Sequence, residues 1–244
     1  QKEVRRTKLS EHLFQISGVQ YETNSNIYAI QHNKGIILID CGFQKVQWER
    51  MTACMDRWNL KLQDITHVFL THSHFDHAGN VWRVNRLGAK VLASADDAEK
   101  VEHGNPEMEE LFGASWICGR VDQRIREGDC FSFPGDVRLR VLETPGHCRG
   151  ALSFLIEVDG LKALCTGDMF FVTPFPPRDQ DDVELGYMGS RDFSLTEFQA
   201  SLGRFQKLEF DLLLPGHYYF YGGAEAGRLI ARAYEKARAL KGDL

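Results

Sequence analysis

Four apolar segments of this chain stop abruptly, and each is followed at once by a short polar motif. Residues 65–70 lead into THSHFDH, residues 137–143 into TPGH and residues 151–165 into TGD, while residues 210–214 end in PGH. Apolar runs of this length, bounded by Gly and Pro, are typical of strands. The pattern predicts a sheet scaffold with polar side chains just past the carboxyl ends of its strands, where functional groups concentrate on loops.

Segments with helical periodicity alternate with these strands. Helices are expected at residues 45–59, 79–87, 194–208 and 223–240, and further strands within residues 25–42 and 89–94. Ser194 followed three residues later by Glu197 is a capping box, and Asp159-Gly160 is a hairpin turn. Strands that alternate with helices predict an α/β fold, and with no linker or low-complexity tract we expect one domain over residues 1–244.

The composition excludes several classes of protein. The net charge of −5 and the isoelectric point near 6.0 argue against a nucleic-acid partner, which calls for a basic surface. No apolar stretch approaches the roughly 20 residues that span a bilayer. We therefore expect a small-molecule substrate, with neither nucleic acid nor membrane as a partner, and the oligomeric state stays open.

The cysteines bear on the compartment. Six are scattered along the chain without a CxxC pair. This pattern favours reduced, mostly buried thiols and hence a cytoplasmic protein. The basic N-terminal stretch has no apolar segment after it, so it does not resemble a signal peptide. Since the chain does not begin with Met, a leader removed from a longer precursor is compatible with the sequence.

The motif THSHFDH holds three histidines and an aspartate within six positions. His72 and His74 point to the same side if the chain is extended, and Asp76 and His77 come from the turn that follows. A single histidine is more often structural than a metal ligand. Imidazoles crowded around a carboxylate, however, need a shared cation to neutralise and orient them. The motif therefore predicts metal binding, with one pair for each of two metals.

The other three polar motifs supply further ligands. His147, Asp168 and His217 each follow an expected strand in a turn that contains Gly. With the first motif they make five histidines and two aspartates, enough for two zinc ions with three ligands each and a carboxylate that touches both. This number leaves an open coordination position for water, as catalytic zinc sites do.

The ordered set of His72, His74, Asp76 and His77, then His147, Asp168 and His217, resembles the metallo-β-lactamase-fold hydrolases, in the branch of glyoxalase II and the lactonases. The resemblance covers nearly the whole chain. It implies a four-layer αββα sandwich of two mixed β-sheets flanked by helices, with the metals at one edge. It also implies two zinc ions per chain, with iron or manganese as alternatives.

The resemblance assigns a role to each ligand. His72, His74 and His147 would hold one metal, Asp76, His77 and His217 the other, and Asp168 would bridge them. Asp40, which follows an apolar strand, would hydrogen-bond a ligand histidine; its alternative role is that of a turn residue. Asp76 would also be catalytic, orienting a metal-bridging hydroxide and later carrying a proton.

The expected activity is hydrolysis of a small ester, thioester or lactone. A small-molecule phosphodiesterase and a β-lactam hydrolase of the same fold are alternatives, and an iron persulfide dioxygenase with a mononuclear site is an alternative of another class. Asp168 speaks against the β-lactamases, which lack the bridging carboxylate. Phe171 stands where the lactonases carry a tyrosine, which weakens that assignment.

Two segments are expected to build the substrate pocket: residues 103–120, which connect the two halves of the chain, and residues 170–193. Together with the tyrosine after His217 they give the candidates Trp116, Phe171, Phe175, Tyr187 and Tyr218. Residues 170–193 form either a lid over the metals or a surface loop, since they are too long and rich in proline for a plain connection. Arg178 and Arg191 are candidates for contact with a substrate carboxylate, with ordinary surface positions as the alternative.

Overall fold

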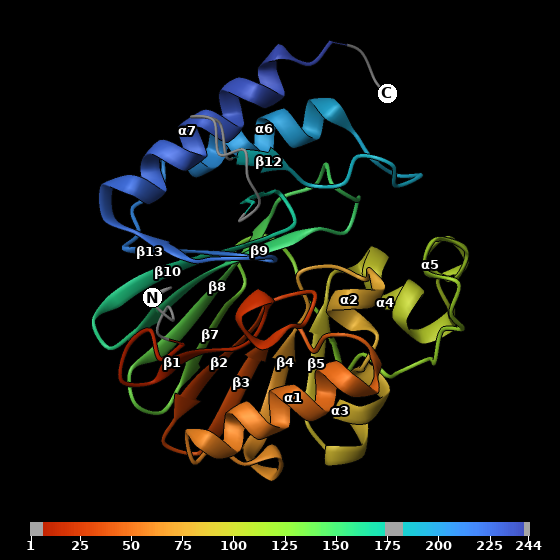
Figure 1. Cartoon of the computed structure of the whole chain (residues 1–244), viewed down its shortest axis with the longest axis vertical. Coiled ribbons are helices and arrows are strands. Elements are labelled where there is room, and N and C mark those ends of the chain that lie inside the picture. Colours follow the sequence, from red (N-terminus) through yellow and green to blue (C-terminus); the bar gives the residue numbers. More distant parts are fainter. Residues whose placement is uncertain (1–6, 174–182, 242–244) are drawn as a thin grey trace.

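A computed structural model describes residues 7–173 and 183–241. Two mixed six-stranded sheets pack face to face, each covered on its outer side by helices (Figure 1). This is the expected four-layer arrangement. The two sheets and their outer helices confirm the predicted α/β class and the αββα layering.

The first sheet has the order β1-β2-β3-β4-β5-β6. Its first three strands pair antiparallel and the rest parallel. The strands are β1 (Leu13–Ser17), β2 (Ile27–His32), β3 (Gly35–Ile39), β4 (Ile65–Phe69), β5 (Lys90–Ala93) and β6 (Gln123–Arg124). The helical elements of this half are η1 (Val19–Tyr21), α1 (Gln44–Arg57), η2 (Leu62–Asp64), α2 (Phe75–Ala78), α3 (Val81–Leu87), α4 (Ala95–His103) and α5 (Pro106–Phe112).

The second sheet has the order β14-β13-β10-β9-β8-β7, and only β10 and β13 pair parallel within it. Its strands are β7 (Cys130–Phe133), β8 (Val137–Glu143), β9 (Leu152–Val158), β10 (Leu161–Gly167), β13 (Leu212–Pro215) and β14 (Tyr221–Gly222). Its outer face carries α6 (Leu195–Phe205) and α7 (Gly223–Ala239), beside a small ribbon of β11 (Phe170–Val172) and β12 (Val183–Leu185).

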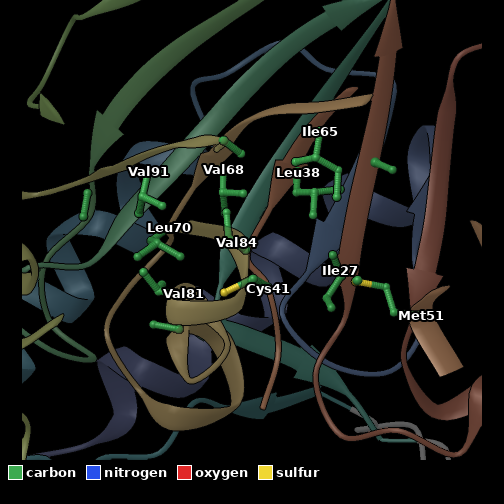
Figure 2. Close-up of a cluster of buried hydrophobic side chains, with 14 of the residues drawn as sticks. Ile27, Leu38, Cys41, Met51, Ile65, Val68, Leu70, Val81, Val84 and Val91 are labelled. Carbon is green, nitrogen blue, oxygen red and sulfur yellow. The ribbon is translucent and has the colours of Figure 1, made fainter. Parts of the chain in front are cut away.

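Strand sequences follow from the layers that each strand contacts. β3 reads GIILI because both of its faces are buried: Ile36 and Leu38 face the helices, and Ile37 and Ile39 face the other sheet. Figure 2 shows Leu38 in the helix-side core, together with side chains from β2, β4 and α1. β8 reads VRLRVLE and alternates, since its arginines are exposed while its other face packs against the first sheet. The core between the sheets fixes their relative position.

Local signals in the second half are confirmed. The side chain of Ser194 accepts a hydrogen bond from the backbone N–H of Glu197 at the start of α6. Asp159 and Gly160 both adopt positive φ, 54° and 73°, in the turn between β9 and β10. The segment of residues 103–120 contains α5, which follows α4. No helix in the described ranges is long and apolar enough to cross a bilayer.

The topology brings the polar motifs to one edge. The loops after β3, β4, β8, β10 and β13 all start at the carboxyl ends of their strands. Residues far apart in the sequence therefore meet at the edge where the two sheets face each other. The strands that lead into these loops are largely buried.

Candidate metal centre

Three histidines form the first cluster of ligand atoms. Nε2 of His147 lies 3.3 Å from Nε2 of His72 and 3.0 Å from Nδ1 of His74. Ligands bound tetrahedrally at a zinc–nitrogen distance of about 2.0–2.1 Å lie roughly 3.3 Å apart. All three side chains are buried. Three imidazole nitrogens that converge away from water at this spacing form a cage for a cation.

The second cluster combines two histidines with two carboxylates. Nε2 of His217 lies 3.2 Å from Oδ2 of Asp76 and 3.2 Å from Oδ2 of Asp168. Nε2 of His77 lies 3.3 Å from Oδ1 of Asp168 and 3.6 Å from Oδ2 of Asp76. These four residues offer mixed nitrogen and oxygen ligands at the same spacing as the first cluster.

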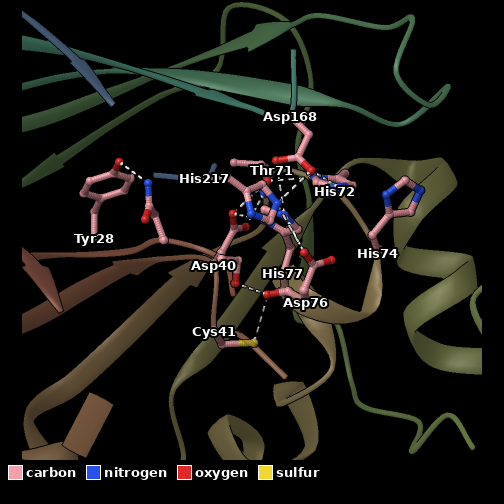
Figure 3. A network of polar contacts seen from close by, with 12 residues as sticks. Tyr28, Asp40, Cys41, Thr71, His72, His74, Asp76, His77, Asp168 and His217 are labelled. Atoms are coloured by element: carbon pink, nitrogen blue, oxygen red, sulfur yellow. Dashed lines mark hydrogen bonds and ion pairs between the residues drawn. The ribbon is translucent and has the colours of Figure 1, made fainter. Parts of the chain in front are cut away.

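Asp168 stands between the two clusters. Besides its contacts with His77 and His217, its Oδ2 lies 4.0 Å from Nε2 of His72 in the first cluster. The rings of His72 and His77 are 4.2 Å apart between centroids. Figure 3 shows Asp168 above the histidines, with its carboxylate directed at them. The structure thus brings together all seven residues that the sequence singled out as ligands.

Asp40 orients one ligand of each cluster. It follows β3 with a positive φ of 62°, and its Oδ2 accepts a hydrogen bond from Nδ1 of His77 at 2.8 Å. It also accepts bonds from the backbone N–H and the hydroxyl of Thr71, at 2.7 and 2.8 Å. Since that hydroxyl donates to Asp40, it accepts from Nδ1 of His72 at 3.0 Å. With their Nδ1 protons engaged in these bonds, the neutral forms of both histidines would present an unprotonated Nε2 to a cation in the clusters.

The other two histidines of the first cluster are oriented by one loop. Nδ1 of His147 donates to the carbonyl oxygen of Tyr187 at 2.8 Å. Nε2 of His74 lies 3.2 Å from the hydroxyl of Ser190. In each ring the other nitrogen faces the cluster. The loop at residues 187–190 therefore orients both rings, and the carbonyl of Tyr187, which can only accept, also fixes the tautomer of His147.

Close backbone approach surrounds Asp168. A Cβ at position 216 would overlap Oδ1 of Asp168, so only Gly216 allows the strand end before His217 to pass beside the carboxylate. The close approach to Asp168 therefore explains why the motif PGH contains glycine.

The pKa values of the ligand histidines show that the second cluster lacks positive charge. Burial lowers the pKa of His74 to about 3, and burial lowers those of His72 and His147 too. For His217, burial also acts to lower the pKa, but the carboxylates of Asp168 and Asp76 outweigh it and raise the pKa to about 10. The first cluster thus offers neutral imidazoles, and the second holds protons in the place of a cation.

Two buried atoms of the ligand residues lack a hydrogen-bond partner within the described part of the chain, and both belong to the second cluster. They are Nε2 of His77 and Oδ1 of Asp168. A buried polar atom without a partner costs about 1–3 kcal/mol, which a bound cation would remove. The donor types and their spacing in both clusters, and these two atoms in the second, fit metal binding.

The residues expected in the substrate pocket have four different outcomes. The ring of Phe171 lies 5.4 Å from that of His217 and 5.3 Å from that of Tyr218, so both aromatic residues lie next to the second cluster. Tyr187 is exposed and reaches the cluster through its backbone. Trp116 packs in the core against Phe75 and donates its indole N–H to the carbonyl of Val101, and Phe175 lies outside the described residues.

Of the two arginines considered for a substrate carboxylate, Arg191 is exposed and pairs with Glu110 at 3.1 Å. Arg178 lies outside the described residues, as does the middle of the expected lid at residues 170–193. The described parts of that segment form β11 and β12 and the loop that holds the histidines.

Sequence reasoning missed several residues that support the site. Nδ2 of Asn24 donates to Oδ2 of Asp76 at 3.0 Å, and the hydroxyl of Ser73 donates to the buried Oδ1 of Asp97 at 2.7 Å. Lys100 on α4 pairs with Asp97 of the same helix and with Asp192, and the second pair anchors α4 to the segment that contains Ser190. No local pattern marks these residues, because each bond joins positions far apart in the sequence. Asn24 and Asp76 are 52 positions apart, Ser73 and Asp97 are 24 apart, and Lys100 and Asp192 are 92 apart.

The family model of the metallo-beta-lactamase superfamily matches residues 21–217. An atrochrysone carboxyl ACP thioesterase of Aspergillus fumigatus is 28% identical over 79% of this chain and 50% of its own length. A hydroxyacylglutathione hydrolase of Maricaulis maris is 32% identical over 45% of this chain and 39% of its own length. An N-acyl homoserine lactonase of Bacillus cereus is 26% identical over 56% and 49%. The chain spans about half, or less, of the length of these relatives.

Solved structures share the fold. A metallo-beta-lactamase from Cronobacter sakazakii superposes with a TM-score of 0.72 at 22% identity, over 95% of this chain and 92% of its own. The FEZ-1 metallo-beta-lactamase from Legionella gormanii gives a TM-score of 0.74 at 16% identity, over 96% and 93%. At these identities the likeness concerns the arrangement of the layers.

Proposed function

The chain belongs to the metallo-β-lactamase superfamily, and from this premise we propose that it is a hydrolase with two metal ions, zinc in the first instance, that cleaves a small ester, thioester or lactone. The observation that carries the proposal is the position of Asp168. Its carboxylate contacts ligands of both clusters, at 3.2 Å from His217 and 4.0 Å from His72. A carboxylate so placed can touch two cations at once, which a mononuclear site does not need.

The ligand residues have separate tasks in this proposal. His72, His74 and His147 would hold one ion, and Asp76, His77 and His217 the other, with Asp168 shared. When bound, zinc ions lower the pKa of water to about 7 and polarise a substrate carbonyl. Each ion would then have three ligands besides the shared Asp168 and could still take water or substrate as a further ligand.

Asp76 handles the proton in this proposal. Burial acts to raise the pKa of its carboxyl, but His77 and His217 outweigh it and lower the pKa to about 2. The carboxylate is therefore ionised at neutral pH and accepts hydrogen bonds. It orients the attacking water and passes the proton towards the leaving group. Asn24, which donates to the same carboxylate, holds it in place.

The relatives support the choice of bond. Their names describe a thioesterase, a hydroxyacylglutathione hydrolase and a lactonase, all of which cleave an acyl carbon from sulfur or oxygen. We assign the same class of bond to this chain and leave the leaving group open.

The experiment combines metal content with a substrate panel. The zinc-loaded protein is assayed with p-nitrophenyl esters, thioesters, lactones, nitrocefin and bis-p-nitrophenyl phosphate. Turnover of the acyl substrates supports the proposal; turnover of nitrocefin or of the phosphodiester alone replaces it with another hydrolase. One iron per chain with oxygen uptake replaces it with a dioxygenase.

Asp76→Ala tests the role of the carboxylate. We expect a loss of at least about 100-fold in kcat, the range of acid–base groups, with an unchanged circular dichroism spectrum. Asp96→Ala is the control, because Asp96 is exposed on α4 and away from both clusters. A folded Asp76→Ala protein that turns over at the rate of the control contradicts the mechanism.

A further inference from the structure

A pocket of 180 Å³ adjoins the second cluster and shares Asp76 with it. Three separate segments build its walls: the loop at residues 22–24, the start of α1 and the last residue of α5. The direct continuity with a candidate metal ligand makes the pocket part of the same site. None of the other described residues that line it belongs to the metal clusters.

One wall of the pocket is apolar and open to solvent. It consists of Phe43, Val46 and Phe112, of which Val46 is 53% exposed and Phe112 37% exposed. The rings of Phe43 and Phe112 lie 5.9 Å apart. Large apolar side chains gathered at the mouth of a pocket mark a binding surface for an apolar group.

The wall is held in a fixed shape before any ligand binds. Phe43 packs on the buried ring of Phe75 at 4.5 Å, next to the ligand Asp76. Its backbone N–H donates to Oε1 of Gln47 at 2.9 Å, and Nδ2 of Asn24 on the opposite side donates to Asp76. A preformed wall loses little conformational entropy when a ligand binds.

The polar groups of the pocket do not suit an anion. Among the described residues that line it, none is Lys, Arg or His. The charged ones are both acidic, Asp76 and Glu22, and Glu22 pairs outside the pocket with Arg50 at 3.1 Å. A carboxylate at the end of the pocket away from Asp76 would lose water without gaining a cationic side chain from the described lining residues, which disfavours its binding.

The volume limits the size of the group. An engineered cavity of about 150 Å³ holds one benzene molecule. A pocket of 180 Å³ therefore suits a group of similar size, about four to six carbon atoms of an acyl chain.

We infer that this pocket takes the short, uncharged, apolar acyl end of the substrate, so that the enzyme discriminates against acyl groups that end in a carboxylate. The inference rests on the proposed function, because it assigns the acyl side of the bond that the metal site would cleave. It makes the far end of the acyl group, rather than the leaving group, the part of the substrate that this pocket selects.

The test compares two ligands that differ only at the far end. Hexanamide and its analogue adipamate, which carries a terminal carboxylate, are titrated into the purified protein with labelled valine methyl groups. We expect hexanamide to shift the signals of Val46 and to bind at least tenfold more tightly. The same pair as p-nitrophenyl esters should differ at least tenfold in kcat/KM.

Val46→Lys places a cation in the pocket, and Leu111→Lys is its matched control. Both positions are exposed apolar residues, 53% and 52%, but Leu111 does not line the pocket. Val46→Lys should improve adipamate binding by about threefold, the value of an exposed ion pair, and Leu111→Lys should leave it unchanged. Circular dichroism verifies that both variants fold; the comparison of the two ligands on the wild type stands without them.

The outcomes separate the two proposals. Equal affinity for both amides, or shifts that bypass Val46, overturn the assignment of the pocket even if esters are hydrolysed. Selective binding of hexanamide without hydrolysis of any ester supports the pocket and contradicts the proposed function.

Discussion

The substitution Asp40→Asn tests whether one oxygen atom, Oδ2 of Asp40, orients ligand histidines in both clusters. Oδ2 of Asp40 accepts from Nδ1 of His77 and from the hydroxyl of Thr71. In asparagine the NH₂ group replaces either Oδ2 or Oδ1, and Oδ1 accepts from the backbone N–H of Thr71, so in both orientations one donor faces another. We expect the carboxamide NH₂ to lie towards His77, since the backbone donor cannot rotate.

The consequence is a change of tautomer. His77 must then carry its proton on Nε2, which faces Asp76 and Asp168 and would bind the metal. The hydroxyl of Thr71 would then accept from the new carboxamide, so it turns its proton towards Nδ1 of His72 and pushes that ring the same way.

The magnitude follows from comparable supporting bonds. Loss of a partner that orients a ligand histidine costs roughly 10- to 100-fold in metal affinity, about 1.4 to 2.8 kcal/mol. We expect the larger effect at the second cluster, where the bond is direct, and the smaller at the first, where Thr71 relays it. Loss of the charge-assisted bond should also lower the free energy of unfolding of the metal-free protein by about 2 kcal/mol.

The assay is a zinc titration in competition with a coloured chelator. Asp136→Asn is the matched control, since Asp136 also has a positive φ, 57°, but is exposed on the turn between β7 and β8. Asp40→Asn protein that is folded and binds both zinc ions with the affinity of the control refutes the orienting role of Asp40.

Three further predictions concern the same site. Without metal the folded pKa is about 3 for His74 and about 10 for His217, against about 6.5 in the unfolded chain. Stability should rise with pH below 6.5, where only the unfolded chain protonates His74, and fall above it, where only the folded chain keeps the proton of His217. Urea titrations with EDTA should peak near pH 6.5; stability that still rises up to pH 9 contradicts this. Ser190→Ala should weaken zinc binding at the first cluster about tenfold and spare the second, as measured by chelator competition; equal losses at both would argue against the bond to His74. Asp97→Asn should lower the free energy of unfolding, measured by urea titration, by about 2 kcal/mol, because it weakens the ion pair between the buried Asp97 and Lys100. An unchanged free energy of unfolding would contradict the anchoring role of this pair.

The sequence predicts most of the frame because its strong signals are local. Alternation identifies β8, the Asp159-Gly160 pair identifies a hairpin, and Ser194 marks the start of α6. The helices α4 and α5, nine and seven residues long, are not marked by a clear apolar periodicity in the sequence.

The ligand residues are recognisable in the sequence for a chemical reason, and the pocket is not. Histidines crowded with an aspartate are costly without a cation, so their presence in one motif carries information. An aromatic residue carries no such information: Trp116 packs in the core, while Phe43 and Phe112, from distant segments, line the pocket. Which apolar side chain faces a cavity depends on tertiary packing, which no local motif reveals.

Metal content is the most direct measurement of the central claim that two clusters hold two cations. Inductively coupled plasma mass spectrometry of purified, zinc-supplemented protein should give about two zinc ions per chain, and about one after His217→Ala, which leaves the first cluster intact. A wild-type protein that retains one ion or none after removal of loosely bound metal would contradict the account.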